Sequence, residues 1–123
     1  MSTLDKFGEF VVVNLRDLAI EQHDIMATGG WRTPSLQPLQ NALASLSEDH
    51  RLIVRRCVVK VLDNATHNIL HALQVAHDLD EGIEVLVDGE NVAELSGMLQ
   101  GEPLGENGWV ARFGKYPPQA EVP

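Results

Sequence analysis

The chain contains a single cysteine, Cys57, so no disulfide bond can form within it. Small folds that depend on disulfides are therefore excluded, and we expect a reducing compartment. Cys57 lies toward the apolar side of a helical pattern, which predicts a buried thiol. No apolar run approaches the roughly 18 residues of a membrane helix, and the N-terminus lacks the layout of a signal peptide. We therefore expect a cytoplasmic protein without membrane association.

Basic residues are also scarce, because nine Lys and Arg stand against 18 Asp and Glu, for a net charge of −9. Binding to nucleic-acid phosphates requires clustered positive charge, so this class of function is excluded. A negative surface permits a basic protein partner, which it would attract by long-range steering. The composition is otherwise that of one ordinary globular domain, with 44% apolar residues.

Glycine and proline are both absent from residues 47–79, which predicts one long helix over residues 48–79 with Ser47 as its N-cap. Turning this stretch at about 100° per residue places the apolar residues on one broad face. We expect that face to be packed by more than one neighbouring helix. Its members are Val54, Val58, Val61, Leu62, Ala65, Ile69, Ala72, Leu73 and Ala76.

Two further helices are predicted before this one. Residues 4–28 carry an apolar stripe at helical spacing and end at Gly29 and Gly30, and we expect the stripe to lie on the core. Residues 36–46 form a shorter amphipathic helix, with Ser35 as its cap. The stripe of the first helix consists of Leu4, Phe7, Val11, Leu15, Leu18, Gln22 and Ile25.

After residue 80 the pattern changes to short β-type runs separated by turn signals. Residues 83–87, 101–104 and 109–113 are predicted strands, and residues 92–100 suit either a strand or a turn of helix. The sequence therefore predicts a predominantly α member of the α+β class. We expect a three-helix body and a small C-terminal antiparallel sheet or hairpin in one domain over residues 1–116, followed by an extended tail at 117–123.

One group of residues suggests metal chemistry. His67 and His71 are four residues apart on the predicted long helix, and Asp63 lies one turn earlier, so all three project from the polar side. Imidazole nitrogen and carboxylate oxygen are ligands for zinc or another divalent transition metal. Asp63 would otherwise fix the tautomer of His67, or all three residues would simply be solvated or face a partner. The stretch His-Asn-Ile-Leu-His lacks the glutamate of a metallo-hydrolase helix.

Trp31 and Arg32 lie in a predicted loop, and Trp109 follows a predicted turn, so these three are candidates for contact with a partner. Packing onto the helices is the alternative for each tryptophan, and it is the favoured one. No nucleophile elbow and no phosphate-binding glycine loop is present, and no Cys–His pair stands out. The sequence thus favours a function without catalysis and without a cofactor.

Four short motifs resemble a group of small bacterial proteins of unknown function. They are F-x-x-F-V-V-V-N-L-R-D at residues 7–17, W-x-x-P-S-L-Q at 31–37, D-x-x-x-H at 63–67 and G-W-x-A-R-F at 108–113. The resemblance implies a bacterial cytoplasmic protein with a helical body and a C-terminal strand region. It supplies no catalytic residues.

Charge and missing motifs together favour a protein–protein interaction module, either a homodimer or an immunity- or antitoxin-like neutraliser of a basic partner. The alternative is a metal-binding protein or a metal-dependent enzyme centred on Asp63, His67 and His71.

Overall fold

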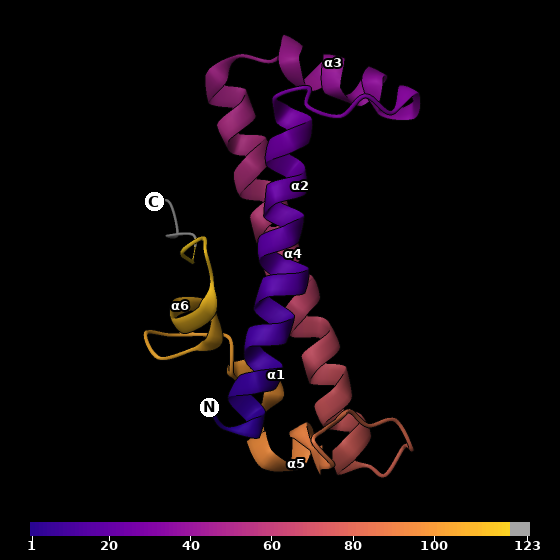
Figure 1. Ribbon diagram of the computed structural model, residues 1–123, viewed down its shortest axis with the longest axis vertical. Coiled ribbons are helices and arrows are strands. Elements are labelled where there is room, and N and C mark those ends of the chain that lie inside the picture. Colours follow the sequence, from indigo (N-terminus) through magenta and orange to yellow (C-terminus); the bar gives the residue numbers. More distant parts are fainter. Residues whose placement is uncertain (119–123) are drawn as a thin grey trace.

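A continuous helical run begins the chain and is shown in indigo and violet in Figure 1. It consists of α1 (Thr3–Val11), a π-helical segment η1 (Val12–Asp17) and α2 (Leu18–Ala27). The Ser2 hydroxyl caps the run by accepting a hydrogen bond from the Asp5 N–H at 3.0 Å. The computed structural model describes residues 1–118, so most of the predicted tail at 117–123 lies outside the described residues.

The predicted long helix is present as α4 (Glu48–Asp78), and the Ser47 hydroxyl caps it as expected by accepting from the His50 N–H. It runs antiparallel to the first helical run and crosses it (Figure 1). Between the two, η2 (Pro34–Leu36) and α3 (Gln37–Ser45) lie across one end of the helix pair. The helical body therefore has the expected two long helices and one short helix.

The C-terminal third contains the only sheet among the described residues, a hairpin of β1 (Leu86–Val87) and β2 (Glu90–Asn91). The two residues between the strands, Asp88 and Gly89, both have positive φ, at 50° and 81°. This geometry is the hairpin turn that Asp-Gly favours. A predominantly α fold of the α+β class with a small antiparallel sheet is thus confirmed, although only the last two residues of the predicted strand 83–87 pair.

The predicted strands at 101–104 and 109–113 are wrong. Residues 92–113 contain α5 (Val92–Ser96), a 3₁₀ turn η3 (Leu99–Gly101) and α6 (Trp109–Phe113). A five-residue run cannot distinguish a period of two from a period of 3.6, because its first and last residues share a side in both. The ambiguous stretch 92–100 is therefore helical, beginning at α5, where the Asn91 side chain accepts from two backbone N–H groups.

The largest buried side chain, Trp109, anchors the C-terminal segment onto the first helix. Its ring meets Phe7 edge-on, with ring centroids 5.8 Å apart and an angle of 88° between the planes. Gly8 makes room for it, since a Cβ added there would lie 2.5 Å from three indole carbons. The C-terminal segment therefore covers one face of the helix pair and seals the core. The core consists of Phe7, Val12, Leu70, Val92, Ala93, Leu99, Trp109 and Val110.

Candidate functional sites

Both long helices carry exposed apolar side chains, and seven of them are called the apolar stripe below. Four of the seven residues lie on the first helical run and three lie on α4. The exposed fractions are 65% for Phe10, 40% for Leu15, 46% for Leu18 and 38% for Ile25 on the first run, and 60% for Val61 and 52% for Ile69 on α4, where Ala65 is also exposed. Isolated exposed apolar residues are ordinary, but three of these residues, Phe10, Leu15 and Ile69, border one groove between the two helices.

A groove of about 310 Å³ lies between the helices within this apolar stripe. Phe10, Leu15 and Ile69 border it, and the half-buried Val11 and Leu73 also line it. Asn14 is its one polar side chain, and its amide already donates to the Phe10 carbonyl oxygen at 2.9 Å. The groove thus offers apolar contact with almost no demand for hydrogen bonds.

The stripe was expected to lie on the core, and the structure corrects this. In the first run, the buried residues Gly8, Val12, Arg16 and Ile20 recur every four residues, and the first three lie one position after the predicted stripe residues Phe7, Val11 and Leu15. Arg16 and Asp17, at the end of the π-helical segment, are buried, whereas Leu15 and Leu18 are exposed. Within residues 1–118, the C-terminal segment packs on the face that carries Phe7, Val12 and Leu70, and the stripe residues stay exposed.

The buried face of α4 also differs from the face that the sequence predicted to be buried. Its buried residues are Val59, Thr66, Leu70, Gln74 and Ala76, and the Gln74 side chain accepts a hydrogen bond from the Leu99 N–H in η3 at 3.0 Å. Val61, Ala65 and Ile69, predicted to be packed by neighbours, are exposed. Cys57 is exposed as well, which corrects the expectation of a buried thiol. Periodicity found the apolar side of this helix, but four of its nine predicted residues, Ala72 included, are exposed in the described part of the chain.

Asp63 does not join the two histidines. Its Oδ1 accepts a hydrogen bond from the Arg16 Nε at 2.7 Å, and the Arg16 side chain is only 2% exposed. Arg16 also donates to the carbonyl oxygens of Tyr116 and Pro117, at 2.6 and 3.3 Å. The carboxylate is therefore one part of a clamp that joins both long helices to the C-terminal segment.

His67 and His71 do lie together, with nearly parallel rings whose centroids are 6.0 Å apart, and both are exposed on α4. Within the described residues, no group of three or more His, Cys, Asp or Glu has an arrangement that could hold a metal ion. A zinc site needs three or four ligands, so this pair lacks a third in the part of the chain described. The metal site remains a prediction.

The three residues predicted to contact a partner have different surroundings. Trp31 is half-buried, and its backbone is held by the buried Gln40, whose amide accepts from the Trp31 N–H at 3.1 Å and donates to its carbonyl oxygen at 2.8 Å. Arg32 is exposed. Trp109 is 0% exposed, so its proposed role in surface contact is wrong, and it is a core residue.

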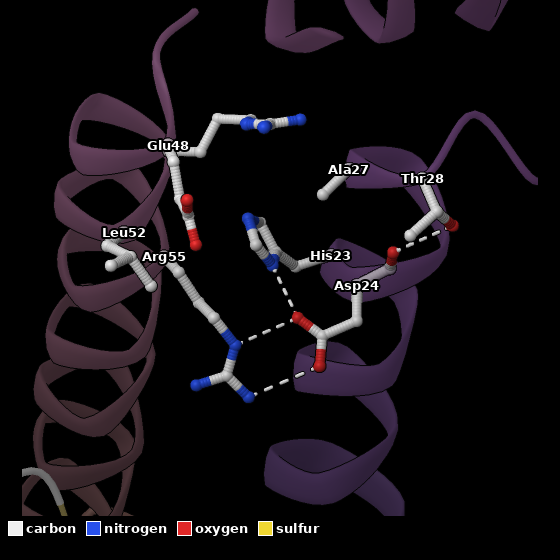
Figure 2. Close-up of a pocket in the computed structure, with 8 residues that line it drawn as sticks. His23, Asp24, Ala27, Thr28, Glu48, Leu52 and Arg55 are labelled. Atoms are coloured by element: carbon white, nitrogen blue, oxygen red, sulfur yellow. Dashed lines mark hydrogen bonds and ion pairs between the residues drawn. The ribbon is translucent and has the colours of Figure 1, made fainter.

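A cleft of about 360 Å³ between α2 and α4 contains residues that the sequence did not single out (Figure 2). The buried His23 places its Nδ1 2.8 Å from Asp24 Oδ1. Arg55 donates to both oxygens of Asp24, at 2.9 and 3.2 Å. The only hint in the sequence was the neighbouring His-Asp pair, because nothing there connects Arg55 to a residue 31 positions earlier.

The electrostatics of this cleft are those of a structural ion pair. Hydrogen bonding by Arg55 holds the pKa of Asp24 below its usual 3.8, and His23 contributes in the same direction. A His–Asp pair assists catalysis when it activates a nucleophile. The hydroxyl that lines the cleft, that of Thr28, is engaged with the carbonyl oxygens of Asp24 and Ile25, at 3.2 and 3.0 Å. The Asp24–Arg55 ion pair therefore joins α2 to α4, and the Thr28 hydroxyl in this cleft is not positioned as a nucleophile.

No family model, no curated protein and no solved structure matches this chain. Within residues 1–118, no helix combines the length and the apolar character needed to cross a bilayer. The function is therefore inferred from the geometry and chemistry of the chain itself.

Proposed function

We propose that this protein is a protein–protein interaction module that self-associates as a homodimer through the apolar stripe on its two long helices. The single observation that carries the proposal is the exposure of Phe10, Leu18, Val61 and Ile69 on the two long helices, where Phe10 and Ile69 border one apolar groove. Burying one large apolar side chain stabilises an association by about 1.5–3 kcal/mol. Several such residues on each copy offset the entropy lost on association.

The extent of the stripe suits a dimer of modest affinity. At about 1.5 Å per residue, Phe10–Ile25 and Val61–Ile69 lie within a surface roughly 25 Å long and, for two helices, about 20 Å wide. Its projected area of roughly 500 Å² per copy lies near the lower limit for a specific interface, of which the smallest bury about 600 Å² per partner. A dimer that dissociates on dilution is therefore expected.

Charge favours a second copy over a basic partner at this surface. The stripe residues are all uncharged, although the chain carries a net charge of −9. A basic protein would meet no carboxylates there, whereas a copy of the same apolar surface presents no unpaired charge to be buried. A two-fold axis through the groove would place the two helix pairs together as a four-helix bundle.

The test is sedimentation equilibrium of the purified chain over a wide range of concentrations. Leu18→Glu and Val61→Glu place a charge in the interface of both copies, so each should give a monomer at concentrations where the wild type is dimeric. Leu95→Glu is the matched control, because Leu95 on α5 is also 46% exposed but lies outside the stripe. Its mass distribution should equal that of the wild type.

Circular dichroism at low concentration separates lost association from lost folding. Leu18 and Val61 are exposed in the single chain, so both glutamate variants should keep the helical spectrum of the wild type. A wild-type chain that stays monomeric at its highest soluble concentration would overturn the proposal, as would dimers that persist in both variants.

A further inference from the structure

His23 presents an unpaired ring nitrogen to the cleft between α2 and α4 (Figure 2). Its side chain is only 7% exposed, and its Nδ1 lies 2.8 Å from Asp24 Oδ1. The other ring nitrogen, Nε2, points away from Asp24 and has no hydrogen-bond partner within residues 1–118. In that part of the chain, the side-chain atoms that lack both a partner and access to solvent belong to Gln100 and Trp109. Nε2 is therefore open to the cleft, where a bound molecule can reach it.

The pairing of Nδ1 decides what Nε2 offers to such a molecule. Hydrogen bonding by Arg55 holds the pKa of Asp24 below its usual 3.8, so its carboxylate is ionised at neutral pH and only accepts hydrogen bonds. Nδ1 therefore donates to Asp24, and in the neutral ring Nε2 keeps a lone pair. The cleft thus contains a fixed acceptor, which water or the N–H or O–H group of a ligand completes.

Two opposite charges line the α4 side of the same cleft. Glu48 and Arg51 are three residues apart, a spacing at which side chains of opposite charge can pair on a helix. Neither forms an ion pair within residues 1–118. Asp24 and Arg55, in contrast, compensate each other. The cleft therefore retains one carboxylate and one guanidinium for a ligand that carries both signs of charge.

The size and the remaining wall of the cleft suit a small molecule with a short apolar group. Ala27 and Leu52 supply apolar contact, one from each helix. The volume of about 360 Å³ lies near the lower end of ligand pockets, which span roughly 300–1,000 Å³. A few convergent polar groups beside apolar contacts are typical of such sites.

We propose that this cleft binds a free α-amino acid with an aliphatic side chain, whose ammonium group donates to His23 Nε2 and to the Glu48 carboxylate and whose carboxylate accepts from Arg51. A free amino acid carries both charges on one carbon, which suits two side chains whose Cβ atoms are about 5–6 Å apart on a helix. A residue within a peptide chain has neither charge, so a protein partner does not fit this site in the same way.

The test uses three probes in calorimetry and in ¹H–¹⁵N NMR titrations of the full chain at constant pH. L-leucine carries both charges, 3-methylbutylamine lacks the carboxylate, and 4-methylpentanoate lacks the ammonium group. L-leucine should bind with saturation and should shift the amide signals of His23 and Arg51. 3-Methylbutylamine should bind about fivefold more weakly, the ratio for one exposed ion pair. 4-Methylpentanoate should bind more weakly still, because it also loses the hydrogen bond to Nε2.

The histidine ring signals test the role of His23 without a substitution. L-leucine and 3-methylbutylamine should each move the ¹⁵N signal of His23 Nε2, because both bring an ammonium donor. 4-Methylpentanoate should leave this signal unchanged. The four other histidines of the chain lie outside the cleft, so their ring signals serve as internal controls.

Two variants assign the charged contacts. Glu48→Gln should weaken L-leucine and 3-methylbutylamine about fivefold but should not weaken 4-methylpentanoate. Arg51→Gln should weaken L-leucine and 4-methylpentanoate by the same factor but should not weaken 3-methylbutylamine. Asp49→Asn and Arg56→Gln are the matched controls, because each removes the same charge from an exposed position outside the cleft. Both should bind all three probes as the wild type does.

Glu48 and Arg51 are exposed, so circular dichroism should show that both variants keep the wild-type fold. The proposal is overturned if L-leucine gives no saturable shifts at the cleft, or if it binds and leaves the Nε2 signal unchanged. It is also overturned if Glu48→Gln and Arg51→Gln bind all three probes as the wild type does. No residue of the apolar stripe lines the cleft, so this inference and the proposed dimer fail separately.

Discussion

Arg16 and Asp63 form an ion pair between the first helical run and α4, with Arg16 Nε 2.7 Å from Asp63 Oδ1 and 47 residues of chain between them. The same guanidinium donates to the carbonyl oxygens of Tyr116 and Pro117. The neighbouring Asp17 carboxylate accepts from the Lys115 N–H at 3.0 and 3.2 Å. One buried arginine thus joins three segments that are remote in sequence. The Asp63 carboxylate compensates its positive charge.

Asp63→Ala should lower the free energy of unfolding by about 3 kcal/mol, because it leaves the buried Arg16 guanidinium without its counter-ion. Urea denaturation measures the loss. Arg56→Ala is the control on the same helix, since Arg56 is exposed and should change the free energy by no more than about 0.5 kcal/mol. Equal stability of the two variants would show that Arg16 does not depend on the carboxylate.

Gly8→Ala should destabilise the protein by about 1–3 kcal/mol, although the same change stabilises most helices. The added methyl would lie 2.5 Å from the indole of Trp109, which is fully buried and cannot move aside. Gly101→Ala is the control, because the nearest atom there is the flexible Met98 sulfur at 3.2 Å. Thermal unfolding compares the two, and a stabilised Gly8→Ala variant would contradict this packing of Trp109.

The stability supplied by Asp24 should depend on pH with a defined sign. Hydrogen bonding by Arg55 lowers the pKa of Asp24 in the folded protein below 3.8, so folding favours its ionised form. The stabilisation is complete above the unfolded pKa, near 3.9, and is lost as the pH falls through the lower folded value. Asp24→Asn should therefore unfold at a lower temperature than the wild type at pH 7.

The difference between the thermal midpoints of Asp24→Asn and the wild type should shrink steadily below about pH 4, where the wild-type carboxyl becomes protonated. Asp5→Asn provides a comparison, because Arg112 lowers the pKa of Asp5 in the same direction from an exposed position. Exposed pairs contribute little, so its effect should be the smaller one. A midpoint difference that is constant with pH would contradict the Asp24–Arg55 pairing.

Zinc should neither copurify with this chain in stoichiometric amount nor raise its thermal midpoint, because His67 and His71 have no third ligand in the described part of the chain. Elemental analysis of untagged protein and thermal shift with added zinc measure both. The double variant His67→Ala, His71→Ala should behave like the wild type in these assays. Stoichiometric zinc that disappears in the double variant would establish the metal site and overturn this expectation.

Several local features could be predicted from the residues themselves. The absence of glycine and proline between Ser47 and Leu79, together with a serine cap, is sufficient for α4. The Asp88-Gly89 turn encodes its hairpin, since few other residues adopt positive φ at both positions. Trp109 to Phe113 could not be assigned in this way, because five residues are too few to reveal a period and their contacts with Phe7 and Gly8 are remote.

Sequence alone determined where the long helices begin and end and which of their residues are apolar, since caps and periodicity are local properties. Only the tertiary structure decided which of those apolar residues are covered. Arg16 lies on the buried face of the first helical run, whereas Leu18 remains exposed. Only the tertiary structure likewise showed that Asp63 is the counter-ion of a buried arginine, because a partner 47 residues away cannot be read from spacing.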